Sequence, residues 1–455
     1  YGQGKKSASG ISILASACGP HSIAAPPYKG RGKQVTVTVT HRKTCRLCDS
    51  KNVELVVKLD PIPLSENYCT DSEIGKQAAR YPVDLYMCAD CGHVQQLDVV
   101  DSKSLWESYT YYSGDAKGMP EHFNQVSKKI RDIYAPPAGS LVVDIGSNDG
   151  SLLRPFKDAG YRVLGIDPAT EIARQATASG VETYPDLMSM ELATKIRSTH
   201  GAAHVVCMFN AFAHADNMGE IAESIRTMLA PDGVFFFEAQ YLLDIIDRVL
   251  IATIFHEHMS HHSVKAIQIF LERHGMELID VERVPIQHGS IIGAVQLKGG
   301  KRKVNASVHE LLALEATRGL EKLETLRAFG HQVSQQKERT RQLARQWKSQ
   351  NLTIAGYGAA RSGPTLISQL GLSGAIDFIV DDHPQKVNRY SSGDGIPIVP
   401  TAELCKRMPA YTIILAWVHA AKIIETNQEY LDKGGNFVVL CPETRVIDRQ
   451  GYVKL

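Results

Sequence analysis

The sequence lacks an excess of charge of either sign. Its 455 residues contain 50 Lys and Arg against 49 Asp and Glu, a formal net charge of +1. Proteins that coat nucleic acid or an anionic membrane usually have a marked basic excess, so we expect neither partner, although a local basic pocket for a phosphate is compatible with this balance. The sequence also lacks an apolar run of the roughly 18 to 20 residues that a transmembrane helix needs. The chain is therefore expected to be soluble, with about three domains.

Residues 1–40 lack a sustained hydrophobic period, are rich in Gly, Ser, Ala, Lys and Pro, and begin with Tyr. We expect a processed or truncated tail outside the fold. A signal peptide is the alternative, and it rests on Lys5, Lys6 and the apolar stretch 11–18. Gly and Ser flank or interrupt that stretch, and the cysteine pattern that follows favours a reducing compartment, so a cytoplasmic location is expected.

The sequence has nine cysteines, an odd number that does not suggest a disulfide framework. Four of them form two CxxC pairs separated by 39 residues, Cys45, Cys48, Cys88 and Cys91. Two residues between thiolates let both sulfurs bind one ion at about 2.3 Å, so the pairs predict a closed, structural four-thiolate zinc site in a module of residues 41–115. The alternative is a pair of redox CxxC motifs or unrelated core cysteines. A redox motif would stand singly at a strand-to-helix turn, whereas these pairs flank strand-like stretches such as 53–57.

Residues 141–167 have the pattern of a βαβ unit. The apolar strand 141–145 runs into a glycine-punctuated loop with the pattern DxGxxxG, formed by Asp144, Gly146 and Gly150. Asp167 follows the second strand, 23 residues after Asp144, where a carboxylate can accept both hydroxyls of a ribose. The loop lacks the GxGxxG of a dinucleotide site and resembles the first motif of class I methyltransferases, which bind S-adenosylmethionine.

Two later stretches favour the same fold. The strand 204–210 is followed by Ala-Phe-Ala-His, and the turn Leu-Ala-Pro-Asp-Gly at 229–233 leads into another apolar strand. We therefore predict a methyltransferase domain over residues 116–300. Its predicted cofactor-binding residues are Asp144, Gly146, Asn148, Gly150, Asp167 and Asn210.

A second strand, glycine turn and helix start, with the pattern GxGxxxxG, opens a C-terminal α/β domain predicted over residues 351–455. Backbone N–H groups at such a turn favour an anion, and Arg361 beside them could pair with a diphosphate. Between the two α/β domains, residues 301–350 carry leucines among many charges. They predict a connector of one or two exposed amphipathic helices, broken or bent near Gly330.

A four-cysteine zinc module, a class I methyltransferase domain and a second Rossmann-like α/β domain together resemble the sugar C-methyltransferases. Those enzymes methylate carbon 3 of thymidine-diphosphate-linked (TDP-linked) 4-keto deoxysugars. The resemblance covers residues 41–455. It rests on CRLC with CADC, YTYYSG at 109–114, DIGSNDG at 144–150, NAFAH at 210–214, FHEHMSHHS at 255–263, HGS at 288–290, GYGA at 356–359, DDHPQKVNRY at 381–390 and LAW at 415–417.

The chemistry of this family explains a His, Glu and Tyr set. A carbon beside a ketone becomes a nucleophile only after it loses a proton, so the site needs a base and donors for the enolate oxygen. The resemblance implies that His258 is the base, that Glu257 orients neighbouring groups or holds the sugar, and that His214 lies near the ketone or a ring hydroxyl. Tyr109 and Tyr112 would supply hydroxyls, with Tyr111 competing for either place. The implied substrate-binding residues are Arg361, Ser290 and His256.

Three departures from the family pattern stand out. Phe255 replaces the usual Tyr of the YHEH motif, which removes one hydrogen-bond donor. His261 and His262 replace aromatics, which predicts a more polar pocket. The C-terminal turn has GYGAARSG where the family commonly has GYGAPAKG, so Ser362 stands at the Lys position. The cluster of histidines also allows a metal site, although the contiguous His-Glu-His fits the methyltransferase motif better than HExxH.

The resulting prediction is S-adenosylmethionine-dependent C-methylation of a nucleotide-linked keto sugar by a monomer or small homo-oligomer. The second hypothesis keeps the methyltransferase and changes the acceptor to another small anionic metabolite, because of Phe255 and the altered turn. The third is a binding or scaffold protein that kept the fold and lost the chemistry, against which stand the intact DxGxxxG, Asp167, His214 and His258.

Overall fold

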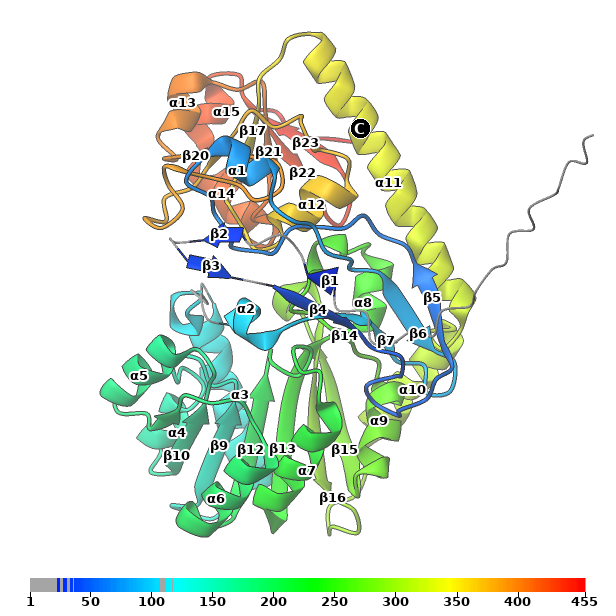
Figure 1. Ribbon diagram of the computed structural model, residues 1–455. Coiled ribbons are helices and arrows are strands. Elements are labelled where there is room, and N and C mark those ends of the chain that lie inside the picture. The colour runs from blue at the N-terminus through cyan, green and yellow to red at the C-terminus, as the bar shows by residue number, and fades with distance from the viewer. Residues whose placement is uncertain are drawn as a thin grey trace, which may run out of the picture.

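The computed structural model describes residues 23–24, 28–30, 33–35, 37–106, 111–116 and 118–454. A central α/β domain and a C-terminal α/β domain lie at opposite ends of the molecule, and the N-terminal module lies against both of them (Figure 1). The predicted fold class is confirmed. No helix of the described residues is long and apolar enough to cross a membrane.

The central domain contains a seven-stranded sheet in the order β11-β10-β9-β12-β13-β16-β15. The first five strands are parallel and the last two pair antiparallel. All five residues of β9 are buried, as expected for a parallel strand covered on both faces. The strands are β9 Leu141–Ile145, β10 Arg162–Ile166, β11 Thr183–Tyr184, β12 Ala203–Phe209, β13 Leu229–Gln240, β15 Met276–Val284 and β16 Ser290–Leu297.

Helices cover both faces of this sheet, and the carboxyl ends of its parallel strands meet at the edge that faces the other two parts of the chain (Figure 1). In sheets of this type, ligands bind at that edge. The helices are α3 Met119–Tyr134, α4 Arg154–Asp158, α5 Thr170–Ala178, α6 Met190–His200, α7 Met218–Met228, α8 Leu242–Asp247 and α9 Val264–Arg273, with 3₁₀ turns η2 Ile251–Thr253 and η3 Ile286–His288.

The C-terminal domain has an eight-stranded sheet in the order β19-β20-β18-β17-β21-β22-β23-β24, parallel from β20 to β22. Its strands are β17 Ile354–Tyr357, β18 Phe378–Val380, β19 Arg389–Tyr390, β20 Pro397–Val399, β21 Tyr411–Ile414, β22 Asn436–Val439, β23 Arg445–Asp448 and β24 Gly451–Lys454. Its helices are α12 Gly363–Gln369, α13 Glu403–Arg407, α14 Ala420–Thr426 and α15 Gln428–Asp432, with a 3₁₀ turn η4 Trp417–His419.

The N-terminal module has two small sheets, in the orders β14-β7-β6-β5 and β1-β4-β8, beside the two-stranded β2-β3. One strand of the first sheet, β14, comes from the central domain. The strands are β1 Ile23–Ala24, β2 Tyr28–Gly30, β3 Lys33–Val35, β4 Thr38–His41, β5 Val53–Val57, β6 Leu85–Cys88, β7 Val94–Gln95, β8 Asp98–Val100 and β14 Ser260–His261. The helices are α1 Ser72–Lys76 and α2 Ser102–Trp106, with a 3₁₀ turn η1 Ser113–Asp115.

The expected tail over residues 1–40 needs a correction. Residues 1–22 lie outside the described residues, but β1 pairs with β4, which pairs with β8. The segment 37–40 therefore belongs to the fold, because its backbone completes a sheet with the zinc module. Its alternating pattern, Val-Thr-Val-Thr, was the available signal.

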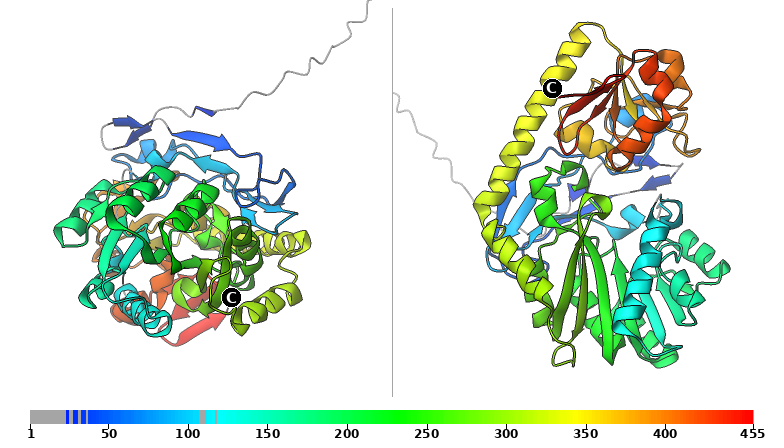
Figure 2. Two further views of the ribbon diagram at one scale, coloured as in Figure 1. Left: turned by 90° about the horizontal axis from the view of Figure 1, so that it is seen from below. Right: turned by 180° about the vertical axis from the view of Figure 1, so that it is seen from behind.

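The connector also differs from expectation. It forms α10 Ala306–Thr317 and α11 Leu323–Ser349, and α11 passes through Gly330 without a break. The interruption lies at Gly319, which has a left-handed φ of +61°. A Cβ at Gly330 would lie 3.3 Å from Val57 Cγ1, so this glycine allows close packing on β5. Figure 2 shows α11 running beside the C-terminal domain down to α10, and its inner side is buried.

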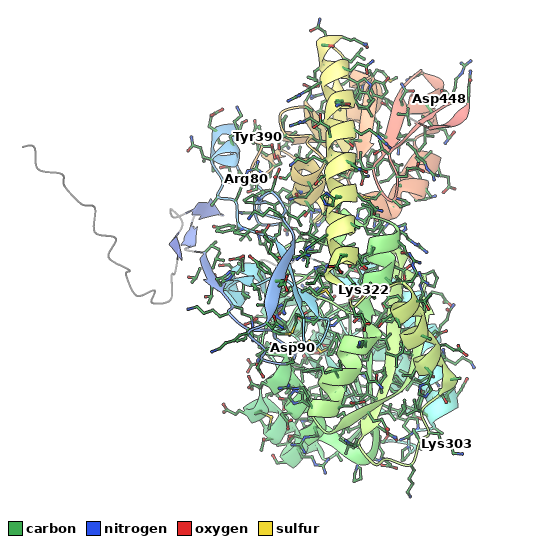
Figure 3. All side chains as sticks on the ribbon, turned by 90° about the vertical axis from the view of Figure 1, so that its right-hand side faces the viewer. Arg80, Asp90, Lys303, Lys322, Tyr390 and Asp448 are labelled. Carbon is green, nitrogen blue, oxygen red and sulfur yellow. The ribbon has the colours of Figure 1, made fainter. Side chains whose placement is uncertain are left out.

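The N-terminal module also contacts the C-terminal domain directly. The Tyr390 N–H donates to the Cys69 carbonyl at 2.9 Å, and the Arg80 guanidinium donates to the Gly393 carbonyl at 2.7 Å. Arg80 and Tyr390 are labelled on these adjoining segments in Figure 3. The three parts of the chain therefore enclose the region between the two sheets.

Candidate active site and metal centre

The four predicted zinc ligands converge. Their Sγ atoms all lie within 4.8 Å of one another. Cys45 and Cys91 are 3.6 Å apart at sulfur, and Cys48 and Cys88 are 3.5 Å apart. A tetrahedron with Zn–S bonds of about 2.3 Å has edges of about 3.8 Å, so the donor set fits zinc. Such a site has no open position, and among the described residues no other group of His, Cys, Asp and Glu could hold a metal.

The zinc module holds the segment 255–261 of the central domain. Strand β14 pairs antiparallel with β7, which places Ser260 opposite Gln95 and His261 opposite Val94. Because β7 begins three residues after the last zinc ligand, Cys91, the metal site fixes the strand to which this segment is bonded.

Two side chains of the zinc module add to these contacts. The Gln96 amide donates to the carbonyls of Phe255 and His258, both at 2.9 Å. The guanidinium of Arg46 donates to the Met259 carbonyl at 2.7 Å. The Phe255 and Met259 carbonyls also accept backbone N–H groups, from His258 and Gln96. Loss of the Gln96 amide would therefore leave only the His258 carbonyl without a donor among the described residues, at a cost of about 1–3 kcal/mol.

A cavity of about 460 Å³ lies at the carboxyl ends of β9, β10 and β12, where a class I methyltransferase binds its cofactor. Asn148 and Asp167 line it, and Gly146 forms part of its wall. The Asp167 carboxylate accepts N–H bonds from Asn148 at 2.8 Å and Ala169 at 2.9 Å, which orients it at the strand end. A Cβ at Gly146 would lie 2.6 Å from the Ala211 Cβ, so this turn requires glycine.

A second cavity, of about 410 Å³, lies between the central and C-terminal domains. His258 and Phe255 line it on one side, and Ala360, Arg361 and Ser362 on the other. The two cavities share a set of wall residues, which places them side by side. The shared residues are Tyr111, Ser113, Gly146, Phe209, Asn210 and His214.

Four aromatic rings form a continuous stack where the cavities meet. Trp106 stacks on His214 at 5.4 Å between centroids, His214 stacks on His258 at 5.1 Å, and Phe255 lies 4.0 Å from His258. The stack brings the two predicted histidines together although 44 positions separate them in the sequence. Phe255 occupies the place beside the imidazole where the family Tyr would present a hydroxyl.

His258 has a defined tautomer. Its Nδ1 lies 2.7 Å from the Thr253 carbonyl, which can only accept, so the proton is on Nδ1 and the Nε2 lone pair is available. Burial lowers the pKa of His258 to about 4, because desolvation disfavours the imidazolium. Burial and the neighbouring His258 also hold the pKa of His214 well below its usual value. Both rings are therefore neutral at pH 7.

Arg361 joins the three parts of the chain through ion pairs. It contacts Glu66 of the zinc module at 3.0 Å and Glu257 of the central domain at 3.2 Å. Burial raises the pKa of Glu257, while Arg361 acts in the opposite direction. Glu257 lines neither cavity, and its ion pair with Arg361 connects it to the wall of the second one. The predicted anion-binding cation is thus shared between two carboxylates.

The backbone groups of the glycine turn in the C-terminal domain are also hydrogen-bonded to side chains of the protein. The Ala359 N–H donates to Asp381 Oδ2 at 2.8 Å, and the His383 N–H donates to Asp381 Oδ1 at 2.8 Å. Lys386 donates to the Ala359 carbonyl at 2.9 Å. This arrangement repeats that of Asp167 in the central domain and serves to fix the turn.

Several predicted site residues lie away from both cavities. His256 contacts the Tyr81 carbonyl at 3.2 Å, and the Ser290 hydroxyl donates to the Ile286 carbonyl at 3.2 Å. Gly150 and Tyr112 also lie outside the cavity walls, and Tyr109 lies outside the described residues. Tyr111 is the tyrosine of this loop that lines both cavities, and its carbonyl accepts from Asn148 at 2.9 Å.

The expectation that His261 and His262 make the pocket more polar is wrong. Both side chains are buried and line neither cavity. His262 stacks on Phe212 at 4.9 Å and lies 5.6 Å from His93, between the central domain and the zinc module. His261 belongs to β14 and points to the face opposite Ser260, which lines the second cavity, whereas the His262 ring is held against Phe212.

The sequence reasoning missed the wall formed by β13 and the loop 286–289. Glu238 and Gln240 line the second cavity from β13. In the loop, φ is positive at three consecutive residues, 49°, 67° and 138° at 287–289, and His288 stacks on Trp417 at 4.5 Å between centroids. The sequence signal for the β13 wall was the polar Glu-Ala-Gln at the end of an otherwise apolar strand.

Comparison with known proteins assigns the family. A model of a putative zinc-binding domain matches residues 45–106, one of a methyltransferase domain matches 121–281, and one of a C-methyltransferase C-terminal domain matches 285–442. The C-methyltransferase NovU of Streptomyces niveus is 32% identical over 407 residues, which cover 89% of this chain and 97% of NovU. The chain belongs to this C-methyltransferase family.

The family membership makes the chain an S-adenosylmethionine-dependent C-methyltransferase with a zinc-binding domain. Other similar proteins cover a smaller share of the chain. The ubiquinone biosynthesis O-methyltransferase of Paraburkholderia phytofirmans is 27% identical over 32% of this chain and 66% of its own length. A solved magnesium protoporphyrin IX methyltransferase from Synechocystis PCC 6803 has 15% identity and a TM-score of 0.31, covering 40% of this chain and 84% of that chain.

The zinc site gives a first prediction. Purified wild-type protein should contain about one zinc per chain, and Cys88→Ser should reduce this to near zero because three thiolates leave the tetrahedron open. Cys405→Ser, at a cysteine outside the cluster, is the matched control. Elemental analysis of the three proteins measures the metal. A folded, metal-free wild type would refute the four-cysteine site.

Asp144 gives a second prediction. Burial, and then the nearby Asp167, raise its pKa from 3.8 to about 8. The folded state therefore keeps a proton between about pH 4 and pH 8 that the unfolded chain has lost, so stability falls as pH rises through this window, by up to about 1.4 kcal/mol per unit. Asp144→Asn should flatten the dependence. Thermal melting without cofactor at pH 5 and pH 8 compares the two proteins, and equal pH slopes would contradict the assignment.

Proposed function

We propose that this C-methyltransferase acts on a nucleotide-linked 4-keto deoxysugar, with thymidine diphosphate as the nucleotide, and that His258 removes the proton from the acceptor carbon. The observation that carries the proposal is the placement of His258, whose neutral ring lines the cavity beside the cofactor cavity. The family resemblance of the FHEH and YTYYSG segments supports the choice of acceptor.

The described residues support a division of labour in this chemistry. His258 Nε2 is free to accept the acceptor's proton, since Nδ1 is bonded to Thr253. A developing enolate beside the ring would raise the pKa of the imidazole from its value of about 4, because an opposite charge favours the cation. S-adenosylmethionine, when bound, supplies a methyl group activated on a sulfonium. His214 and Asn210, which line both cavities, would position the acceptor against it.

The second cavity suits a long ligand. It extends from His258 to Ala360, Arg361 and Trp417 of the C-terminal domain. We propose that the ketone end lies at His258 and the diphosphate end at the C-terminal domain. Arg361 has ion pairs with Glu66 and Glu257. To bind a diphosphate, its guanidinium would either contact the diphosphate and the carboxylates together or break one of these ion pairs.

A second candidate has its own supporting observation. Because Arg361 is paired with two carboxylates and the Ala359 N–H with Asp381, the C-terminal turn offers less to a diphosphate than its sequence predicted. An acceptor with another anionic group, bound elsewhere in the same cavity, is therefore the alternative. The base, the cofactor and the reaction would be the same.

The proposal predicts proton exchange at the acceptor carbon without methyl transfer. Wild-type enzyme with S-adenosylhomocysteine and a TDP-4-keto deoxysugar in D₂O should exchange the proton next to the ketone, as followed by NMR. His258→Ala should slow the exchange by about 10²-fold or more, since it removes the base. Its affinity for S-adenosylmethionine should stay within about twofold.

His309→Ala, at an exposed histidine of α10, is the control and should exchange at the wild-type rate. Exchange by His258→Ala at the wild-type rate would place the base elsewhere. No exchange by wild-type enzyme would contradict the 4-keto sugar as acceptor.

A further inference from the structure

Glu238 stands at the carboxyl end of β13 with its side chain fully buried at the wall of the second cavity. Its Oε2 lies 2.5 Å from Nε2 of His122, a residue of α3. Its Oε1 is also buried, and no group of the described residues donates to it. A buried carboxylate oxygen without a donor is costly, and it needs either a partner from the ligand or water.

The bond to His122 defines what Oε1 can do. If the proton is on His122, the carboxylate accepts it at Oε2 and Oε1 is an acceptor. If the proton is on Oε2, the carboxyl group donates to the imidazole and Oε1 is again an acceptor, as a carbonyl. In both cases, the group that meets Oε1 has to be a donor.

Gln240 adds a second acceptor on the same wall. It follows Glu238 by two residues on the same strand, so the two side chains point to the same face of the sheet. Its Oε1 is buried and receives no donor from the described residues. Gln240 lines the same cavity, and its backbone pairs with Ser290 of β16.

We propose that Glu238 and Gln240 form a hydroxyl-binding subsite for the methyl acceptor, with His122 as the positioning residue. The ligand class is a polyhydroxylated ring with neutral O–H donors on this side, because a phosphate or carboxylate would meet the Glu238 carboxylate. The inference rests on the proposed function and adds that the sugar ring, not the diphosphate, occupies the β13 wall. Glu238 also lies beside the cofactor cavity, since its carbonyl accepts the Asn210 N–H at 3.0 Å.

The test compares TDP-glucose with thymidine diphosphate by calorimetry on enzyme saturated with S-adenosylhomocysteine. The wild type should bind TDP-glucose more tightly than thymidine diphosphate, because the sugar hydroxyls reach the two acceptors. Glu238→Gln keeps the size of the side chain. If His122 carries the proton, the amide oxygen accepts it and the NH₂ donor faces the cavity, so the preference for TDP-glucose should fall by about tenfold; if the His122 nitrogen is the acceptor, the amide oxygen faces the cavity and the preference stays.

Glu282→Gln is the matched control, because Glu282 is on the same sheet and contacts α3 through Lys129 but does not line the second cavity. It should keep the wild-type preference. Gln240→Leu is a second variant, which should also reduce the preference and keeps the test open if Glu238→Gln does not fold. Melting temperature and S-adenosylmethionine affinity report folding.

The outcomes separate the two proposals. An unchanged preference in folded Gln240→Leu overturns the subsite, whichever way the amide of Glu238→Gln lies, and leaves the proposed function intact. A wild type that binds thymidine diphosphate and TDP-glucose equally also overturns the subsite. A wild type that binds neither compound contradicts the nucleotide-linked acceptor and, with it, the subsite that rests on it.

Discussion

The active site depends on the hydrogen bonds between the zinc module and the segment 255–261. This segment has no regular structure apart from the two residues of β14, so the central domain alone does not fix its course. Its shape is imposed by pairing with β7 and by the side chains of Arg46 and Gln96. The zinc site is structural, and through these bonds it positions His258.

The same logic extends across the rest of the site. Arg361 ties the zinc module and the central domain to the C-terminal domain, and His288 of the central domain stacks on Trp417 of the C-terminal domain. Each of the three parts supplies some wall or support of the two cavities, and none encloses them alone. A carbon acid needs a base, a methyl donor and an acceptor held within contact distance, and such positioning supplies a large part of the rate enhancement.

Much of the fold could be predicted because local patterns determine it. The buried parallel strands are continuous apolar runs, and the tight turns after them have room only for glycine. Two CxxC pairs typically bind one metal ion together. The family resemblance then placed His258 and His214, which the structure brings into one stack. Signals of this kind lie within short stretches of sequence, so they can be recognised without knowledge of tertiary contacts.

Other features could not be predicted because they depend on contacts between distant segments. Gly330 suggested a helix break, but its role is set by its distance from Val57 of the zinc module. His261 and His262 suggested a polar pocket, but both are buried outside the cavity walls, His262 against Phe212. Arg361 suggested a free anion site, but Glu66 and Glu257 pair with it from two other parts of the chain. In each case the residue type suggested a role, but the sequence did not show which distant residue it contacts.

Gln96→Leu tests the central claim most directly, because it removes the donor to the Phe255 and His258 carbonyls at a residue that is neither a zinc ligand nor part of a cavity wall. The account predicts that kcat for methyl transfer falls by about tenfold or more, while zinc content and affinity for S-adenosylmethionine stay within about twofold of wild type. Gln125→Leu, at an exposed glutamine of α3, should leave all three unchanged. A folded, zinc-loaded Gln96→Leu enzyme with wild-type kcat would contradict the claim that the zinc module positions the catalytic segment.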